Sequence, residues 1–348
     1  MNFKKDNFLS LSRDRAGQFS NETEFTINSH TRVKIWCRGI ISFEPLGLDA
    51  NKKVKSILLS CGLHGNETAP IEICDALVDD LINAKIQTSH RLMVIFGNLE
   101  AMDIAERFVE ENLNRLFDAG IKTADECENI EQHRAQAIKR CVDEFFAVDE
   151  NKPTNHDNSQ RFHYDLHTAI RESKNEKFAV YPFLHGEAIN TEQLRFLSLC
   201  DVNTILLSQS PTTTFSYYTS RYYNAHSFTV ELGKVMPFGE NQMSKFSAAD
   251  RALRALVEHN TMDLPSWSDC PIEVFEVKQV INKKTHAFAL NFADDLPNFS
   301  AFEEGELIAS DGDINYKATQ HGEAIVFPNA KVEIGQRAIL TVVPCNVE

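Results

Sequence analysis

The chain has 348 residues, of which 43% are hydrophobic and 24% charged, values typical of a globular protein with a sizeable core. Its formal net charge of −15 argues against nucleic acid or an anionic membrane as a partner, because both bind basic surfaces. The cysteines are scattered without a Cys-x-x-Cys pair, and we find neither an apolar leader nor a membrane-length apolar run. We therefore expect reduced thiols in a cytoplasmic protein.

The first 265 residues alternate predicted strands and helices, which indicates an α/β domain with a mixed sheet flanked by helices. Alternating or continuously apolar runs predict strands at 24–27, 33–37, 55–60, 91–98, 162–167, 178–182, 204–207 and 227–232. Apolar residues at helical spacing predict helices at 70–84, 129–147, 191–200 and 246–260. Polar composition predicts surface loops at 149–160 and 209–225.

The character of the chain changes after Leu264-Pro265. Short alternating runs are separated there by Asp, Gly, Pro and Asn, and no helical period persists. We therefore divide the chain into an α/β domain at 1–265 and a small all-β domain at 266–348. The sequence leaves open whether the chain forms a homo-oligomer and what the second domain does.

A turn at 61–70 follows a predicted buried strand and precedes a predicted helix, and it contains His64 and Glu67. Open α/β sheets bind ligands at this edge. An imidazole and a carboxylate are two of the three protein ligands that a catalytic zinc ion needs, with the fourth position open to water. An ordinary turn with solvated side chains is the alternative interpretation.

Strand alternation places Asp165 and His167 on one face of the strand at 162–167. If that strand neighbours the one before His64, His167 completes a His-Glu-His site, and Asp165 could orient an imidazole from behind. Otherwise His167 is a histidine that caps a strand end. Glu231 ends another predicted strand, where a buried carboxylate is costly unless it is paired or functional, so it is the candidate general base. The alternative is an exposed glutamate at a strand end.

Arg107, Arg115 and Arg221 lie in predicted loops, and each alone is typical of a solvated surface charge. Together they matter, because an acidic protein that handles an anionic amide needs fixed guanidinium groups. Tyr217 is equally ambiguous, since aromatic loop residues often only pack. The sequence contains no Gly-x-Ser-x-Gly elbow, no phosphate-binding Gly-x-x-x-x-Gly-Lys loop and no His-Glu-x-x-His motif.

The combined pattern resembles the succinylglutamate desuccinylase/aspartoacylase family of zinc carboxypeptidase-like amidohydrolases. The matching elements come in the family's order and spread over about half the chain: Gly62-Leu63-His64-Gly65-Asn66-Glu67, Gly97-Asn98, Arg107, Asn112-Leu113-Asn114-Arg115, Asp165-Leu166-His167 and Glu231-Leu232-Gly233. The resemblance implies a zinc-carboxypeptidase-like catalytic domain and hydrolysis of a small anionic amide.

The resemblance also implies a role for each matched residue. One zinc ion per chain would be held by His64, Glu67 and His167, with Glu231 as base and Arg107 polarising the scissile carbonyl. Asn114 and Arg115 would hold a substrate carboxylate. The spacings of Tyr217 and Arg221 before Glu231 are similar to those of substrate-contacting residues in the aspartoacylase branch.

Two features favour the desuccinylase branch: the stretch 165–171, and the length with a β-rich C-terminal part. That branch hydrolyses N2-succinyl-L-glutamate, which the resemblance implies is the last step of a bacterial arginine catabolism route. Because this substrate carries three carboxylates, we add Arg171 as a further hypothetical substrate contact. The alternatives are an aspartoacylase-like N-acylamino-acid hydrolase, and a metal-binding module without catalytic activity.

Overall fold

The structure, a computed structural model, describes residues 6–14, 19, 22–47, 54–117, 120, 122–147 and 161–347. The predicted surface loop at 149–160 lies outside the described residues. Within the described ranges, no helix is both long and apolar enough to cross a lipid bilayer. All eight cysteines carry free thiols.

One mixed sheet runs through the described part of the chain, in the order β1-β2-β3-β5-β4-β6-β9-β7-β8-β10-β16-β15-β12. Its strands are β1 (Thr23–Ile27), β2 (Thr31–Cys37), β3 (Ile40–Pro45), β4 (Ser56–Cys61), β5 (Arg91–Phe96), β6 (Arg161–Ala169), β7 (Phe178–Tyr181), β8 (Thr204–Leu207), β9 (His226–Lys234), β10 (Glu273–Asn282), β12 (Ser300–Phe302), β15 (Glu323–Val326) and β16 (Arg337–Cys345). At its centre β5, β4, β6 and β9 are parallel neighbours, so their carboxyl ends share one edge.

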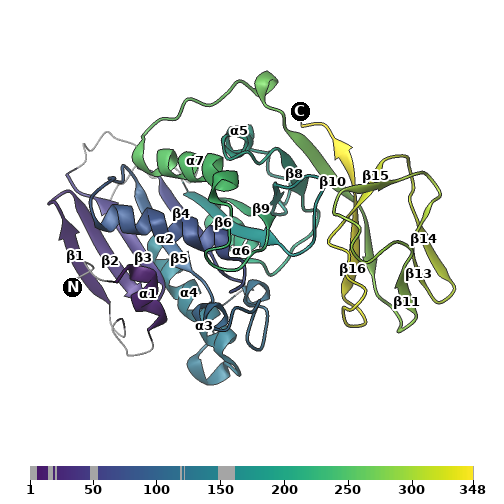
Figure 1. Ribbon diagram of the computed structural model, residues 1–348, viewed down its shortest axis with the longest axis horizontal. Coiled ribbons are helices and arrows are strands. Elements are labelled where there is room, and N and C mark those ends of the chain that lie inside the picture. Colours follow the sequence, from purple (N-terminus) through teal and green to yellow (C-terminus); the bar gives the residue numbers. More distant parts are fainter. Residues whose placement is uncertain are drawn as a thin grey trace.

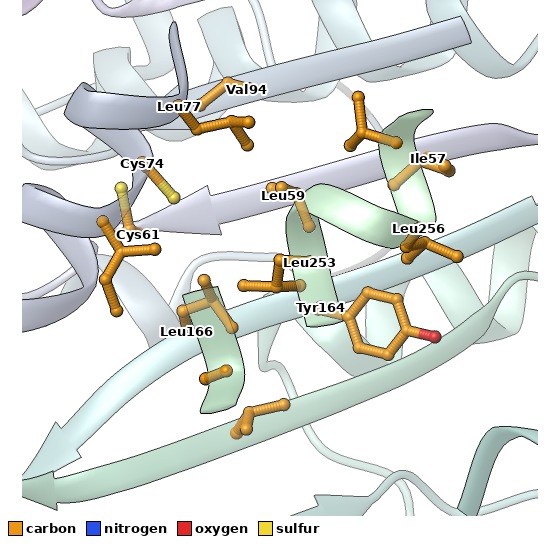
Figure 2. Packing of buried hydrophobic residues seen from close by; sticks show 14 of the residues in the cluster. Ile57, Leu59, Cys61, Cys74, Leu77, Val94, Tyr164, Leu166, Leu253 and Leu256 are labelled. Carbon is orange, nitrogen blue, oxygen red and sulfur yellow. The ribbon is translucent and has the colours of Figure 1, made fainter. Parts of the chain in front are cut away.

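Helices cover both faces of this sheet (Figure 1). They are α1 (Phe8–Arg13), α2 (Thr68–Ile82), α3 (Leu99–Asp103), α4 (Ile130–Phe146), α5 (Thr191–Leu199), α6 (Phe215–Tyr223) and α7 (Ser247–Glu258). Side chains alternate along β4, so the sheet has a hydrophobic core on each face. Ile57 and Leu59 face one core and Leu58 faces the other. Figure 2 shows the first core, in which α2 and α7 pack on β4 and β6. Helices α4 and α6 pack in the second core.

The chain continues after α7 into a β-rich part at one end of the molecule (Figure 1). Strand β10 pairs in parallel with β8, so the sheet is continuous between the two parts. A separate sheet contains β11 (Phe288–Leu290), β13 (Leu307–Asp311) and β14 (Ile314–Lys317). The fold is thus a helix-flanked mixed sheet with a small C-terminal β domain, as predicted. The boundary at residue 265 stays a prediction.

The predicted long loop at 209–225 is wrong in part, because it contains the helix α6. Arg221, predicted in a loop, therefore lies in a helix. Thr214 caps the start of α6 and Asn224 ends it in a left-handed conformation. The Ser-, Thr- and Tyr-rich composition hid the helical period, because the buried face includes Thr219 as well as aromatic residues. Arg115 likewise lies in a short 3₁₀ turn.

Candidate metal centre

The turn between β4 and α2 brings His64 and Glu67 to the carboxyl edge of the sheet. Gly62 has a φ of +62°, which an L side chain rarely adopts. At Gly65 a Cβ would lie 2.2 Å from the backbone carbon of Ala101, so only glycine allows the two segments to approach this closely. The chain then enters α2 directly after Glu67. Sequence and sterics together fix this turn.

His167 reaches the same point from the neighbouring strand β6. The Nδ1 atoms of His64 and His167 each lie 2.8 Å from a different oxygen of the Glu67 carboxylate. The ligand-type atoms of these residues lie within 4.8 Å of one another, and all are buried. The Nδ1 of His64 has no hydrogen-bond partner despite this proximity. The structure therefore brings together the His-Glu-His triad that the sequence predicted.

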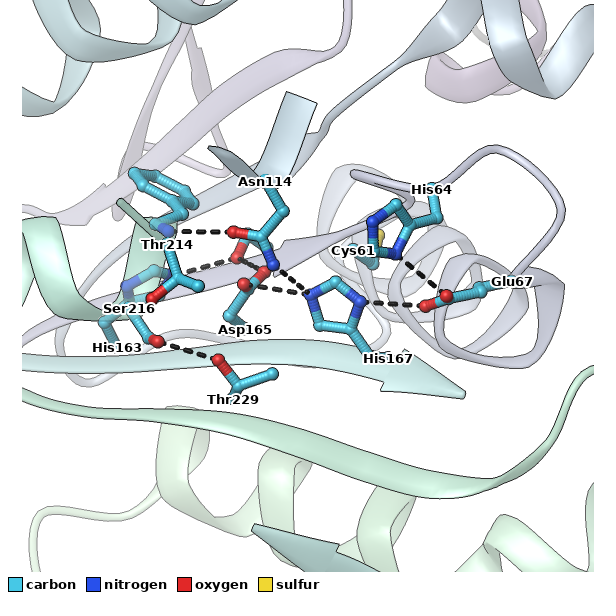
Figure 3. Close-up of polar contacts among 12 residues, drawn as sticks. Cys61, His64, Glu67, Asn114, His163, Asp165, His167, Thr214, Ser216 and Thr229 are labelled. Carbon is cyan, nitrogen blue, oxygen red and sulfur yellow. Dashed lines mark hydrogen bonds and ion pairs between the residues drawn. The ribbon is translucent and has the colours of Figure 1, made fainter. Parts of the chain in front are cut away.

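The opposite nitrogen of each imidazole is held by a side chain from behind. Asp165 Oδ2 lies 3.0 Å from His167 Nε2, and Asn112 Oδ1 lies 3.0 Å from His64 Nε2. These contacts leave each Nδ1 directed at Glu67, as Figure 3 shows for the side chains drawn. Such outer partners fix the tautomer and the ring orientation of a ligand histidine. Asp165 thus contacts His167, and its role in orienting a metal ligand stays a prediction.

The charges of the triad favour a cation at its centre. Burial acts to raise the pKa of Glu67, yet electrostatic attraction to His64 and then His167 holds it well below the ordinary carboxyl value. Burial acts to lower the pKa of His167, whereas Asp165 and then Glu67 hold it well above the ordinary value. Burial lowers the pKa of His64. Two carboxylates thus surround imidazole nitrogens, and this donor set fits a divalent metal ion.

Glu231 lies on β9 opposite His167 in the register of β6 and β9. Its side chain is buried, and its Oε2 atom has no hydrogen-bond partner. Burial, and then repulsion from Glu67, raises the pKa of Glu231 to about 7. A buried carboxyl group with a raised pKa therefore lies beside the triad.

Polar residues from 107–115 complete the surroundings of the triad. Arg107 Nη1 lies 2.6 Å from Glu67 Oε1, and Asn114 Nδ2 lies 3.3 Å from His167 Nε2. The Oδ1 of Asn114 accepts the first backbone N–H of α6, which fixes the amide (Figure 3). Arg115 is accessible to solvent, yet surrounding protein lowers its pKa to about 10, and the like charges of Arg337 and Arg107 act in the same direction. Positive charge is therefore concentrated next to the triad.

Three predicted substrate contacts make no described contact with the triad. The guanidinium of Arg171 donates to the backbone oxygens of Leu296 and Pro328 in the C-terminal part, at 2.8 and 3.2 Å. The hydroxyl of Tyr217 lies 2.9 Å from His185 Nε2. Arg221 is exposed one helical turn after Tyr217. Their roles in substrate binding stay predictions.

Two residues near the site escaped sequence reasoning. Asn112 was noted only as part of a matching motif, and its contact with His64 gives it a place behind the triad. Arg337 lies at the start of β16, about 220 residues after Arg115, and its charge acts on Arg115. A single arginine at the start of a strand carries no signal in one sequence, so only the fold could identify it.

Comparisons with known proteins show which family the chain resembles in sequence and fold. Residues 53–257 match the family model described as succinylglutamate desuccinylase/aspartoacylase catalytic domain, and residues 270–345 match the AstE/AspA barrel-sandwich hybrid domain. The chain is 51% identical to a succinylglutamate desuccinylase of Pseudoalteromonas atlantica, over 98% of this chain and 95% of the relative. A relative of the same name from Idiomarina loihiensis is 45% identical, over 100% and 98% of the two chains. A crystal structure of succinylglutamate desuccinylase from Vibrio cholerae superposes with a TM-score of 0.87 at 33% identity, covering 99% of this chain and 96% of that chain.

Proposed function

Because the chain belongs to the succinylglutamate desuccinylase/aspartoacylase family, we propose that it hydrolyses N2-succinyl-L-glutamate to succinate and L-glutamate. The bond cleaved is the linear amide between the succinyl group and the glutamate nitrogen. The observation that carries this proposal is the pairing of a His-Glu-His group that could hold a metal ion with a buried carboxyl group, Glu231, one of whose oxygens has no hydrogen-bond partner. A storage or structural zinc site has a closed fourth ligand and no need of a base.

We propose zinc, one ion per chain, as the metal held by His64, Glu67 and His167. Two imidazoles and a carboxylate with an open fourth position are typical of catalytic zinc, and the Nδ1 of His64 is a buried nitrogen without a hydrogen bond. A zinc ion bound there supplies Lewis acidity, which makes water more acidic and an amide carbonyl more electrophilic. The geometry also fits other divalent ions, so the identity of the metal as zinc is itself proposed.

Glu231 and Arg107, beside the triad, have different proposed roles in the reaction. Glu231 takes the proton of the attacking water and delivers it to the leaving amine nitrogen, a task for which a pKa near neutrality is suited. The Arg107 guanidinium, which is near Glu67, stabilises negative charge as it develops on the carbonyl oxygen. Both residues would act on atoms whose charge changes during the reaction, namely the water oxygen, the amine nitrogen and the carbonyl oxygen.

Substrate carboxylates would be held by fixed donors next to the triad. Asn114 and Arg115 are the proposed contacts for one carboxylate, with Tyr217 and Arg221 as further contacts from α6. The pKa of Arg115 is lowered by burial and then by the like charge of Arg337, and this supports an anion site, because a bound anion would offset both effects. Such a local positive field is needed in a protein whose formal net charge is −15.

The test compares kcat/KM for N-succinylglutamate and N-acetylaspartate with the zinc-loaded protein. We expect a strong preference for the succinyl substrate, and loss of turnover by at least about a thousandfold in Glu231→Ala with zinc still bound. Metal content measured on the same sample separates loss of the base from loss of the ion.

Two other outcomes would change the assignment. Preference for N-acetylaspartate would keep the metal-assisted mechanism but assign the chain to aspartoacylase-like activity. Failure of the fully metallated protein to hydrolyse either amide would favour a metal-binding module without catalytic activity.

A further inference from the structure

We propose that Glu131, on α4, is a positioning residue that holds the segment 104–112 against the metal ligands. This inference rests on the proposed function for its catalytic consequences, although its structural part stands on contacts alone. The segment connects α3 to the 3₁₀ turn at Leu113–Arg115 and contains no helix or strand of its own. Its shape therefore depends on what its backbone is bonded to.

The segment contacts two of the three metal ligands, one near each end. Arg107 Nη1 lies 2.6 Å from Glu67 Oε1, and the Arg107 carbonyl oxygen accepts the backbone N–H of Gly65 at 3.2 Å. Asn112 Oδ1 lies 3.0 Å from His64 Nε2. A displacement of this segment would therefore move the proposed oxyanion-stabilising group and the outer partner of a ligand histidine together.

Hydrophobic burial does not hold the segment in place. Ile104, Phe108 and Val109 expose 53%, 39% and 40% of their surface to solvent. Side chains that face water contribute little to anchoring the backbone that carries them. The anchor must come from polar contacts to the backbone itself.

Glu131 supplies that anchor from the interior. Its side chain is only 1% exposed. Oε1 accepts the backbone N–H of Val109 at 2.7 Å and the side-chain amide of Asn98 at 3.0 Å. Both carboxylate oxygens lie 3.4 Å from the backbone nitrogen of Glu110. Charged hydrogen bonds of this kind are stronger than neutral ones, and they connect the middle of the segment to the end of β5 through Asn98.

Capping of α4 does not explain this arrangement. The cap is Asn129, whose side chain accepts the backbone N–H of Gln132 at 2.9 Å. The Glu131 carboxylate instead accepts hydrogen bonds from Asn98, Val109 and Glu110, outside the helix. The helix is in turn fixed by apolar residues that pack in the second core, namely Ala135, Ile138, Val142, Phe145 and Phe146. Glu131 thus connects the well-packed helix α4 to the segment 104–112, which has no regular secondary structure of its own.

The decisive experiment is a double-mutant cycle between Glu131 and Arg107. We expect Glu131→Ala to lower kcat/KM for N-succinylglutamate by about 30-fold, mainly through kcat, and to cost less than about threefold in an Arg107→Ala background. Glu131→Gln should restore most of the activity, because its amide oxygen can still accept the N–H of Val109. Glu128→Ala is the matched control, since Glu128 is exposed near the same helix end, and it should leave kcat/KM unchanged.

Hydrogen exchange tests the structural part without relying on turnover. The amides of Val109 and Glu110 should exchange at least about tenfold faster in Glu131→Ala than in the unmodified protein or in Glu131→Gln. If Glu131→Ala does not fold, Glu131→Asp replaces it, because aspartate keeps the charge but shortens the side chain by one methylene.

The possible failures are distinguishable. An equal loss of kcat/KM in both backgrounds would overturn the positioning of Arg107 by Glu131, and unchanged exchange at Val109 and Glu110 would overturn the anchoring of the segment. An unmodified protein that hydrolyses no amide would overturn the proposed function, and hydrogen exchange would then decide the inference about Glu131.

Discussion

Burial shifts the pKa values of individual ionisable residues in this protein away from their ordinary values. Glu231 is the clearest case at the site, since its carboxyl group is buried beside Glu67 and one of its oxygens has no hydrogen-bond partner. Such a group is unfavourable for stability and is retained where its proton transfer is useful. The consequences of burial can be measured as pH dependence.

We expect kcat/KM for N-succinylglutamate to fall at acidic pH because of Glu231. A general base acts only when ionised, and the raised pKa of about 7 means that ionisation is lost as pH falls through this region. Positive charge on a bound metal stabilises the carboxylate, so the limb should lie at or below pH 7 with a slope of one. A flat profile between about pH 5 and pH 8 would contradict the assignment of Glu231 as base.

Asp75 offers a prediction on stability that is independent of catalysis. This α2 carboxyl accepts a hydrogen bond from Asn7 at 2.7 Å, and its other oxygen is buried without a partner. Burial raises its pKa to about 6, so the folded state favours the protonated form. The stabilisation from this protonated group is present below the unfolded pKa and is lost as pH rises through about 6.

Asp75→Asn should therefore raise the free energy of unfolding at pH 8 by about 1 to 2 kcal/mol after allowance for solvent screening, and change it little at pH 4. Urea denaturation at the two pH values checks this. Asp313→Asn, at an exposed position, is the control and should show no pH-dependent difference. Equal effects of Asp75→Asn at both pH values would contradict the argument.

At the scale of elements, β6 carries a line of buried polar groups behind His167, its proposed metal ligand. Asp165 contacts His167, and its other oxygen accepts the Ser60 hydroxyl of β4 at 2.6 Å. Ser60 also lies 2.8 Å from His163 Nε2 (Figure 3 shows the β6 side chains). Because residues two apart on a strand share a face, three polar residues of β6 form one network. Each oxygen of Asp165 is thereby fixed.

We expect Asp165→Asn to weaken metal binding by about 10- to 100-fold, because the amide cannot supply the negative charge behind His167. Competition with a chelator gives the dissociation constant without any substrate. Ser60→Ala should have a smaller effect of the same sign. If both variants bind metal as tightly as the unmodified protein, the network does not support His167.

Periodicity in the sequence predicted those elements whose pattern reflects packing. The strands near 55–60 and 162–167 are continuously buried, and the helix near 246–260 has one apolar face. The His-Glu-His triad was predictable because parallel strands place their carboxyl ends at one edge. Helix α6 was missed because its buried face includes hydroxyl groups that pair with β9, as Ser216 does with Thr229.

The burial and the contacts of single charged residues could not be predicted from the sequence. Glu131 occupies the first turn of an amphipathic helix, where an acidic residue normally faces water and interacts with the helix dipole. Its burial depends on the segment 104–112 folding over it, which no local pattern encodes. The proximity of Arg337 to Arg115 likewise depends on where the fold places a strand that is distant in the sequence.

At the scale of the whole molecule, the C-terminal part is joined to the catalytic part close to the site. Four residues after His167, Arg171 donates both of its described hydrogen bonds to backbone oxygens of Leu296 and Pro328. Arg337 lies 5.9 Å from the ring centre of Phe327, next to Pro328. The segment that Arg171 holds is therefore continuous with the one that contacts Arg337, whose charge acts on Arg115.

This continuity gives the substitution of Arg171 a definite expected result. Arg171→Ala should raise KM for N-succinylglutamate by about 5- to 10-fold with little change in kcat, and should lower the free energy of unfolding by about 1 to 2 kcal/mol through loss of its hydrogen bonds.

Arg171→Lys separates charge from geometry, because a lysine keeps the positive charge but lacks the fork that reaches two carbonyls. Recovery of KM in Arg171→Lys would indicate direct attraction of the substrate carboxylate. A KM that stays high would indicate that Arg171 acts by holding the C-terminal part in place. Unchanged kinetics in Arg171→Ala would contradict both roles, because either of them requires the guanidinium for binding of the trianion.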